Sequence, residues 1–491
     1  MSEDRVPGAG PAMPRRDFIR AVSSAAIASG LGVGATAGFA ANGARTAVVI
    51  GAGIAGLSAA WELRKAGFAV RIFEKWEFVG GRMRDAWMGP IWGPPHALGI
   101  SEANREMFAL GAELGIGDQL AGDAGSDEFM VDNGVGTYQS SLSFRIDHIR
   151  TIPGMSEETR GRLARLRPDL ERWGRETDFC LMTSGAAEDD ESIGHYYERM
   201  LGKEAAREVI DYWVDVVLNA WGWPAYQTSK MAIMPWFAEQ EARVVVPRGG
   251  IGVLTQKLGE SMPVETNTTV RYVSPADAEG RHTIHYLTPR FERASVTPDV
   301  VVCATEGKYV PSLIQGLDRQ QRQFFEAIDF TKGGGVSYIL KDGFAPTEPV
   351  FGAYTPNHPD PLKRKVTLWG ASAGDPTRKG QPARAQILLS RAEFIRWQGT
   401  NTTLPEYCLP ILRQLYPSLP DEAIADVVVS GTDDLIYIPV GYIRQAAAIL
   451  RAQESRRRGL YFAGEYMAGA HTGAACASGR TVARCIARHW A

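Results

Sequence analysis

The sequence has few cysteines and no spacing typical of a metal site. The chain has 491 residues and contains only Cys180, Cys303, Cys408, Cys476 and Cys485. No two of these form a C-x-x-C pair, which argues against a disulfide framework or a zinc site and predicts buried thiols. His282 and His285 have no third ligand close by in the sequence. We therefore expect no bound metal.

Excess charge and long apolar runs are also missing. The chain has 53 basic and 56 acidic residues, a formal net charge of -3 and no basic stripe. This argues against nucleic acid or an anionic membrane as a partner. After the N-terminal segment, no stretch reaches the roughly 18 apolar residues of a membrane span. With 45% hydrophobic residues, the chain has enough apolar side chains for a large core and two or three domains.

Residues 1–44 differ in composition from the rest of the chain. Arg15 and Arg16 precede Phe18 and a Gly/Ala-rich, mildly apolar stretch that ends in small residues at 37–41. This order resembles a twin-arginine export signal, which carries folded proteins. It predicts a periplasmic or extracellular protein whose cofactor is loaded before export. Whether the segment is cleaved stays open.

A βαβ unit with a glycine-rich turn follows directly. Residues 46–50 (TAVVI) are typical of a buried parallel strand, 54–67 have apolar residues at helical spacing, and 69–74 (AVRIFE) predict a second strand. In such a unit of about 30 residues, the pattern G-x-G-x-x-G indicates dinucleotide binding.

Each position of this motif has a physical role. Gly51 permits the tight turn, Gly53 lets the backbone approach a pyrophosphate, and Gly56 allows close helix packing. The amides that open the helix, at Ile54 and Ala55, favour an anion. Glu74 ends the second strand and is placed to accept hydrogen bonds from a ribose without a 2′-phosphate.

The next residues carry a family resemblance. Gly80, Gly81 and Arg82 follow the second strand. Here the chain resembles the flavin-containing amine oxidase superfamily, which includes monoamine and polyamine oxidases, L-amino-acid oxidases, protoporphyrinogen oxidase and phytoene-desaturase-like enzymes. The resemblance implies FAD, with Gly81 and Arg82 near the pyrophosphate and ribityl and Lys75 among the expected contacts. No cysteine lies where some relatives attach flavin, so the FAD is expected to be non-covalent.

The end of the chain carries a second motif of this superfamily. LYFAGE (460–465) predicts a strand and turn, and 472–487 predict a helix of small residues. The resemblance places Gly464 and Glu465 at the ribityl-pyrophosphate and the helix N-terminus at the flavin pyrimidine. The expected contacts at this N-terminus are Thr472, Gly473 and Ala474.

Three intervening segments agree with the resemblance. They are a strand-to-helix corner at 244–258, a strand at 264–273 whose Val270 is expected over the adenine, and a buried strand at 294–305. We therefore predict an α/β fold with a Rossmann-like FAD-binding domain of the GR2 type and an interleaved α+β substrate domain. The expected FAD domain comprises 45–100, 244–310 and 425–491, and the substrate domain 101–243 and 311–424.

The substrate domain is rich in aromatic residues, and 101–243 is expected to be mostly helical. Such a run can line an apolar pocket, but it more commonly forms core, and core is our prediction here. The residues concerned are Trp173, Trp213, Trp221, Trp223, Tyr226, Trp236 and Phe237. Strands are expected at GGVSYIL and KVTLWGA.

Three positions depart from the classical amine oxidases. The flavin-facing lysine of those enzymes aligns with Gly335, unless a shifted register brings in Lys332. The carboxylate-binding arginine of L-amino-acid oxidases has no equivalent unless Arg105 substitutes for it. An aromatic cage position falls near His471. These departures weaken a simple primary-amine or amino-acid specificity.

Other segments resemble the desaturase-like branch. Residues 93–116 match its G-x-H run, with His96 at the histidine, although a loop histidine satisfied by backbone is the commoner role. YIPVGYI (437–443) resembles a segment that covers the flavin in protoporphyrinogen oxidases and desaturases. No catalytic residue is identified; the weak candidates are His96, Lys332 and His471.

We therefore expect an FAD-dependent oxidoreductase that removes a hydride from a C–H bond of a mostly apolar small molecule, with or without an amine. Its electron acceptor would be oxygen or a quinone, and a homodimer is left open. One alternative is an exported, oxygen-dependent amine oxidase that produces hydrogen peroxide. The other is a non-catalytic FAD-fold protein analogous to guanine-nucleotide-dissociation inhibitors, against which the complete terminal motif argues.

Overall fold

The computed structural model describes residues 45–490, apart from 98, 123–127, 142–145, 240–241, 345–350, 376, 378, 433–434 and 457. The predicted export signal lies outside these residues. Within the part that is described, no helix combines the length and the hydropathy needed to cross a bilayer.

A five-stranded parallel sheet contains both predicted ends of the FAD-binding domain, in the order β19-β13-β1-β2-β9. Its strands β1, β13 and β19 are almost fully buried, which explains their continuous apolar sequences. The strand bounds are Thr46–Ile50 (β1), Ala69–Phe73 (β2), Val264–Glu265 (β9), Val300–Cys303 (β13) and Gly459–Phe462 (β19). The strands predicted at both ends of the chain are confirmed.

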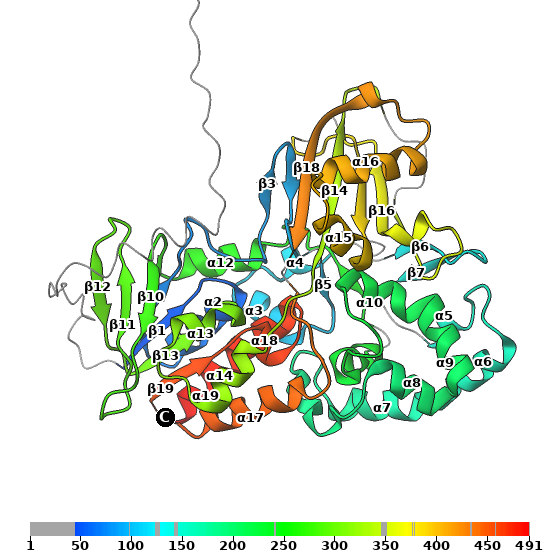
Figure 1. Ribbon diagram of the computed structural model, residues 1–491. Helices are drawn as coiled ribbons and strands as arrows, with labels where there is room; N and C mark the ends of the chain where they lie inside the picture. The colour runs from blue at the N-terminus through cyan, green and yellow to red at the C-terminus, as the bar shows by residue number, and fades with distance from the viewer. Residues whose placement is uncertain are drawn as a thin grey trace, which may run out of the picture.

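Two long helices pack against each other beside this sheet. They are α2 (Ile54–Lys65) and α19 (Thr472–Arg488), both predicted from the sequence. A Cβ at Gly479 of α19 would lie 2.1 Å from the Ala55 carbonyl oxygen of α2. The α/β, Rossmann-like architecture of the prediction is confirmed, with the two motif helices in direct contact (Figure 1).

Two predicted single strands are each divided. Residues 264–273 form β9 and, after Asn267 with a φ of +52°, β10 (Thr269–Val273). Residues 294–305 form β12 (Arg293–Val296) and β13, with Pro298 between them. Strands β10 and β12 belong to a separate antiparallel sheet with β11 (Ile284–Leu287). The chain therefore leaves the parallel sheet between β9 and β10 and returns to it between β12 and β13.

A seven-stranded sheet forms the second layer, in the order β18-β14-β17-β16-β15-β6-β7. Its strands β14 and β16 are the predicted GGVSYIL and KVTLWGA strands. The bounds are Glu128–Asp132 (β6), Thr137–Ser141 (β7), Gly333–Leu340 (β14), Phe351–Tyr354 (β15), Val366–Ser372 (β16), Arg384–Leu389 (β17) and Ile424–Thr432 (β18). Strand β18 pairs with β14, so residues 425–432, predicted with the FAD domain, lie in this other sheet. The rest of the domain division stays a prediction.

Helices α15 (Arg391–Gln398) and α16 (Leu404–Leu415) pack on the seven-stranded sheet, and residues 105–238 are mostly helical, as predicted (Figure 1). The helices of that region are α3 (Arg105–Glu113), α4 (Gly117–Leu120), α5 (Ile146–Ile149), α6 (Glu157–Arg162), α7 (Arg167–Glu176), α8 (Ile193–Leu201), α9 (Lys203–Val209), α10 (Asp215–Trp221) and α11 (Met234–Ala238).

Further elements connect these layers. The helices are α12 (Val253–Ser261), α13 (Val310–Leu313), α14 (Arg319–Glu326), α17 (Tyr442–Glu454) and α18 (Glu465–Ala468). The strands are β3 (Ala86–Met88), β4 (Ile91–Gly93), β5 (Ile100–Ser101) and β8 (Val244–Val245). Helix α18 joins the last parallel strand to α19 and so positions the terminal motif.

Candidate functional site

A cavity of about 1430 Å³ extends from the carboxyl ends of the parallel strands to the seven-stranded sheet and the helical region. Its lining includes the glycine turn after β1, the end of β2, β10, the loop before α19 and the start of β14. Segments far apart in the sequence therefore share one space, and the carboxyl end of a parallel sheet is where such folds bind ligands.

The glycine turn has the geometry that its sequence predicts. Gly51 has a φ of +104°, and a Cβ there would lie 2.8 Å from the Ala304 carbonyl oxygen. A Cβ at Gly56 would lie 2.0 Å from the Gly51 oxygen, so this residue serves helix packing and does not line the cavity. A Cβ at Gly53 would have no heavy atom within 4 Å. Gly53 therefore presents open backbone to the cavity, beside Ile54 and Ala55.

Glu74 lines the cavity with its carboxylate held in place. The side chain is buried; its Oε2 accepts a hydrogen bond from the Ala52 amide at 2.8 Å and its Oε1 accepts one from the Trp76 amide at 2.9 Å. Next to it, the Lys75 ammonium lies 4.9 Å from the centre of the Tyr309 ring. The two amide hydrogen bonds fix the Glu74 carboxylate as an acceptor at the end of β2.

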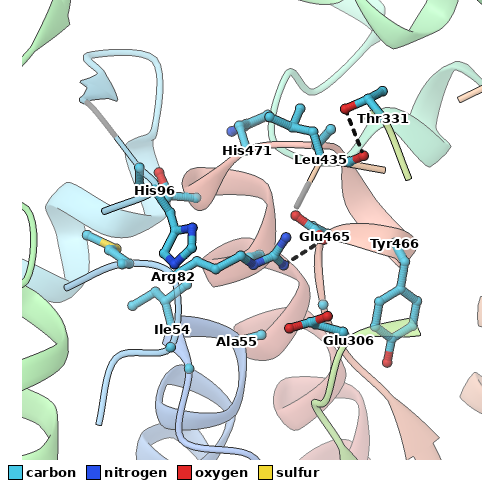
Figure 2. Close-up of a pocket in the computed structure, with 18 of the residues that line it drawn as sticks. Ile54, Ala55, Arg82, His96, Glu306, Thr331, Leu435, Glu465, Tyr466 and His471 are labelled. Atoms are coloured by element: carbon cyan, nitrogen blue, oxygen red, sulfur yellow. Dashed lines mark hydrogen bonds and ion pairs between the residues drawn. The ribbon is translucent and has the colours of Figure 1, made fainter. Parts of the chain in front are cut away.

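The first and last motifs of the chain meet through an ion pair. Arg82 Nη2 lies 2.6 Å from Glu465 Oε1, and both side chains line the cavity (Figure 2). The loop before Arg82 is anchored because the Gly80 amide donates to the Ala52 carbonyl at 2.8 Å. On the other side, the Gly464 amide donates to Ser478 Oγ at 3.0 Å. Sequence reasoning placed both residues at one cofactor but did not predict their direct contact.

The start of α19 is only partly open to the cavity. Thr472 and Ala475 line it, whereas Gly473 and Ala474 are buried behind them. A Cβ at Gly473 would lie 2.1 Å from Asn104 Oδ1, so this glycine permits close packing against the chain before α3. Val270 of β10 also lines the cavity; its place over an adenine stays a prediction.

His471 caps α19 and begins an aromatic wall. Its Nδ1 accepts from the Ala474 amide at 3.1 Å and its Nε2 donates to the Phe179 carbonyl at 3.2 Å. The imidazole stacks on the Phe179 ring at 4.2 Å. Burial lowers the pKa of His471 to about 4, so the ring is neutral at pH 7. It therefore acts there as a fixed, uncharged surface.

The aromatic wall continues away from His471. The Phe179 ring lies 5.9 Å from Trp236, which stacks on Trp221 at 4.9 Å, and Trp221 lies 5.2 Å from Trp223. All four line the cavity. The core prediction is therefore wrong for Trp221 and Trp236, which are only partly buried against the core; Tyr226 is also not core, being 45% exposed. It is confirmed for Trp173, Trp213, Trp223 and Phe237, which are buried in the helical core.

Of the remaining residues that the sequence suggested for the site, some line the cavity and others do not. His96 lines the cavity beside Arg82, and Lys332 lies on its wall (Figure 2 shows His96). Gly335 does not line it: a Cβ there would lie 2.4 Å from the Ile387 oxygen within the sheet. Arg105 is exposed on the surface, with its Nη2 3.4 Å from Glu239 Oε1, and cannot substitute for a cavity arginine. Within 437–443, predicted to cover the flavin, no residue lines the cavity, although Leu435 just before it does.

Sequence reasoning missed several lining residues. Thr331, whose Oγ1 donates to the Leu435 carbonyl at 3.3 Å, and Arg391 both line the cavity end near β14 (Thr331 and Leu435 in Figure 2). Phe179 was also missed. No local motif marks these positions, because they reach the cavity only when β14, α15 and the helical region pack together.

Other reactive groups lie elsewhere. All five cysteines are buried, and none lines the cavity. Among the residues that the structure describes, no three His, Cys, Asp or Glu side chains gather in a group that could hold a metal.

Comparison with known proteins identifies the family of this chain. Residues 54–487 match the family model described as flavin containing amine oxidoreductase. Protoporphyrinogen oxidase 2 of Arabidopsis thaliana is 30% identical over 176 residues, which are 35% of this chain and 32% of that protein. The match thus spans about a third of the curated relative.

Solved structures cover nearly the whole fold. Cyclohexylamine oxidase from Brevibacterium oxydans IH-35A is 15% identical with a TM-score of 0.64, over 91% of this chain and 99% of its own. A putative protoporphyrinogen oxidase from Exiguobacterium sp. 255-15 is 16% identical with a TM-score of 0.65, over 90% and 99%. At these identities the likeness concerns the fold.

Proposed function

Because this chain belongs to the flavin-containing amine oxidoreductase family, we propose that it takes a hydride from a C–H bond of a mostly apolar small molecule. The protein is an FAD-dependent oxidoreductase, which sets aside the non-catalytic alternative. The proposal concerns the substrate and the acceptor, oxygen or a quinone. When bound, FAD supplies the two-electron chemistry, and the chain orients the reactants and keeps water out.

The residues around the cavity fit FAD. Glu74 would accept from the ribose, and the open backbone at Gly53 with the first amides of α2 would bind the diphosphate. Arg82, oriented by Glu465, would add a positive charge close to the diphosphate and ribityl. Val270 would cover the adenine, and Thr472 at the start of α19 would face the flavin. The helix N-termini supply free N–H groups for anions and carbonyl oxygens.

The aromatic wall is the observation that carries the proposed substrate class. Phe179, Trp221 and Trp236 extend from His471, next to the expected flavin end, into the helical region. Aromatic surfaces of this kind favour an apolar substrate and exclude water from it. Since His471 is neutral and held by two backbone groups, it would position the substrate without exchanging a proton.

An anaerobic experiment tests this proposal. Purified holoenzyme is mixed without oxygen with a panel of apolar compounds, each with and without an amine, and the flavin absorbance is followed. Bleaching by apolar compounds that lack an amine is expected. Bleaching confined to amines would contradict a desaturase-like reaction.

Lys332 favours the second candidate, an oxygen-dependent amine oxidase, because its side chain lies on the cavity wall. In such an enzyme, a lysine near the flavin would assist the reaction with oxygen. Lys332→Met would then slow reoxidation by oxygen by about tenfold or more, with unchanged anaerobic reduction by substrate. Hydrogen peroxide release on amines by the wild type would support this candidate.

We further propose that FAD is bound without a covalent link, since the cavity lining contains no cysteine. Acid precipitation should release the flavin into the supernatant. Flavin that stays with the pellet would contradict this.

Export through the twin-arginine route is proposed for residues 1–44 on the basis of Arg15, Arg16 and the apolar stretch after them. Arg15→Lys with Arg16→Lys should retain the protein in the cytoplasm. Equal periplasmic amounts of both forms would contradict the proposal.

A further inference from the structure

Arg391 is a cation in the cavity lining without a matching anion. It is the first residue of α15 and is partly buried. Its Nη1 donates to the Gly222 carbonyl at 3.1 Å, and its buried Nε has no hydrogen-bond partner among the described residues. No described carboxylate forms an ion pair with it. A guanidinium has five donors, so most of its hydrogen-bonding capacity is open.

Apolar side chains and a few uncharged polar groups surround Arg391. A Cβ at Gly222 would lie 3.1 Å from Thr331 Cβ and 3.6 Å from Arg391 Cδ, so these three residues are in close contact. Leu388 and Leu389, which precede Arg391 in the sequence, also line the cavity, as do Gln398 and Ser430. This part of the cavity therefore favours a negative charge.

The carboxylates of the cavity lining do not neutralise this end. Glu74 accepts from two backbone amides, and Glu465 pairs with Arg82. Glu306 lies 2.8 Å from Lys308. Each of the three is already engaged by its own partner.

The aromatic wall connects the cation to the expected flavin end. Gly222, which accepts from Arg391, directly follows Trp221, and the rings continue through Trp236 and Phe179 to His471. In Figure 2, Thr331 lies on the side of Glu465 away from Ile54 and the glycine turn. An apolar surface thus runs from the flavin end to a basic end.

We propose that the substrate is an apolar, ring-bearing molecule with a terminal carboxylate, and that Arg391 binds this carboxylate. The proposal rests on the proposed function in taking this end of the cavity as the substrate chamber. The substrate carboxylate would accept two charge-assisted hydrogen bonds from the Arg391 guanidinium, and the apolar body of the substrate would pack on the aromatic wall. A terminal ammonium would instead face the like charge of Arg391.

The test compares three compounds that share one body: 3-phenylpropionate, 3-phenylpropylamine and 3-phenylpropan-1-ol. Their dissociation constants for the FAD-loaded protein are measured by calorimetry at pH 7.5. The acid is expected to bind about tenfold more tightly than the amine or the alcohol. Equal affinities, tighter binding of the amine or no binding of the acid would overturn the proposal.

Variants separate charge recognition from packing. Arg391→Gln should weaken the acid about tenfold and leave the alcohol within about twofold, and Arg391→Lys should recover part of the loss. Arg396→Gln is the control, because Arg396 lies on the same helix, is exposed, pairs with Glu393 and does not line the cavity. Equal losses for acid and alcohol in Arg391→Gln would overturn the assignment.

This test is independent of turnover. The titrations are run without oxygen, so that the heat of continuous turnover does not add to the heat of binding and the affinities compare the three head groups. If the acid ranks first but no apolar compound bleaches the flavin, the proposed reaction fails and the substrate charge stands. If apolar compounds bleach the flavin but the acid shows no preference, only the Arg391 proposal fails.

Discussion

The carboxylate of Glu74 accepts two backbone amides before any ribose reaches it, which makes it a preorganised acceptor. In Glu74→Gln, the side-chain NH2 group replaces one carboxylate oxygen, so that it faces the backbone amide that this oxygen accepted from. The substitution also removes the charge. We expect the dissociation constant of FAD to rise about 10- to 100-fold, since a charged hydrogen bond contributes about 1.5–3 kcal/mol. Quenching of flavin fluorescence on titrating the apoprotein measures it.

Glu77→Gln is the matched control, because Glu77 lies in the same loop and is exposed. FAD affinity should not change in this variant. A Glu74→Gln protein that binds FAD as tightly as Glu77→Gln would contradict the assigned role.

His471 links stability to pH. Burial lowers its pKa from 6.5 to about 4, so between these values the unfolded chain binds a proton that the folded protein does not. Folding stability from this group is therefore complete above pH 6.5 and falls by up to about 3 kcal/mol as the pH drops to 4. His471→Phe keeps a ring against Phe179 but does not titrate.

Urea unfolding at pH 7.5 and pH 4.5 measures the effect. Relative to wild type, His471→Phe should gain stability on acidification. A difference between the two proteins that is independent of pH would mean that His471 titrates normally.

At the scale of elements, the packing of α2 on α19 aligns two helix N-termini with the cavity. A Cβ at Gly479 would lie 2.1 Å from the Ala55 oxygen and 2.4 Å from Ser58 Oγ. Gly479→Ala should therefore push the helices apart, cost about 1–3 kcal/mol of unfolding free energy and weaken FAD binding. Chemical denaturation and FAD titration measure the two effects.

Gly161→Ala provides the comparison. Gly161 lies in α6, and a Cβ there would have no heavy atom within 4 Å. This substitution should be neutral or stabilising by up to about 1 kcal/mol. Similar losses in both variants would refute the packing argument.

A buried ionic cluster ties the same helices together. Arg480 of α19 is buried; its Nε donates to Glu62 of α2 at 2.7 Å, and its other nitrogens contact the Glu106 carbonyl and the Glu113 carboxylate of α3. Arg480→Gln would leave the buried Glu62 without its main partner. The expected loss is about 3–5 kcal/mol by urea unfolding.

The exposed pair of Arg207 with Asp211 serves as the control. Arg207→Gln should hardly change stability, because exposed ion pairs contribute little. An Arg480→Gln protein as stable as Arg207→Gln would show that the cluster is not structurally important.

The sequence predicted well those elements whose structure depends on residues within a single short segment. The turn at Gly51 and the helix starting at Ile54 follow from φ requirements and apolar periodicity within one segment. The strand at 264–273 was predicted as one element, because its apolar residues do not reveal that Asn267 adopts a positive φ and divides it between two sheets.

Candidate site residues followed the same rule. Glu74 and Arg82 were identified by motifs, whereas Arg391 and Phe179 depend on long-range packing that no local pattern encodes. Trp221 and Trp236 were assigned to the core because burial and pocket lining require the same apolar chemistry. Their stacking toward His471 became apparent only in the folded chain.

At the scale of the whole molecule, segments between residue 50 and residue 475 that lie far apart in the sequence contribute to one cavity. A ligand that contacts all of them stabilises the folded state alone. FAD added to apoprotein at 100 times its dissociation constant should raise the unfolding free energy by about 2.7 kcal/mol and shift the melting temperature upward. An unchanged melting temperature would mean that FAD does not bind the folded chain in this manner.

The central claim is that the motifs at the two ends of the chain form one FAD site, joined by the Arg82–Glu465 pair. Its most direct test is the amount of flavin in the purified protein, measured from the absorbance at about 450 nm and by acid release. The account predicts one releasable FAD per chain and a clear loss of it in Glu465→Gln. A colourless protein that takes up no FAD when it is supplied would contradict the account.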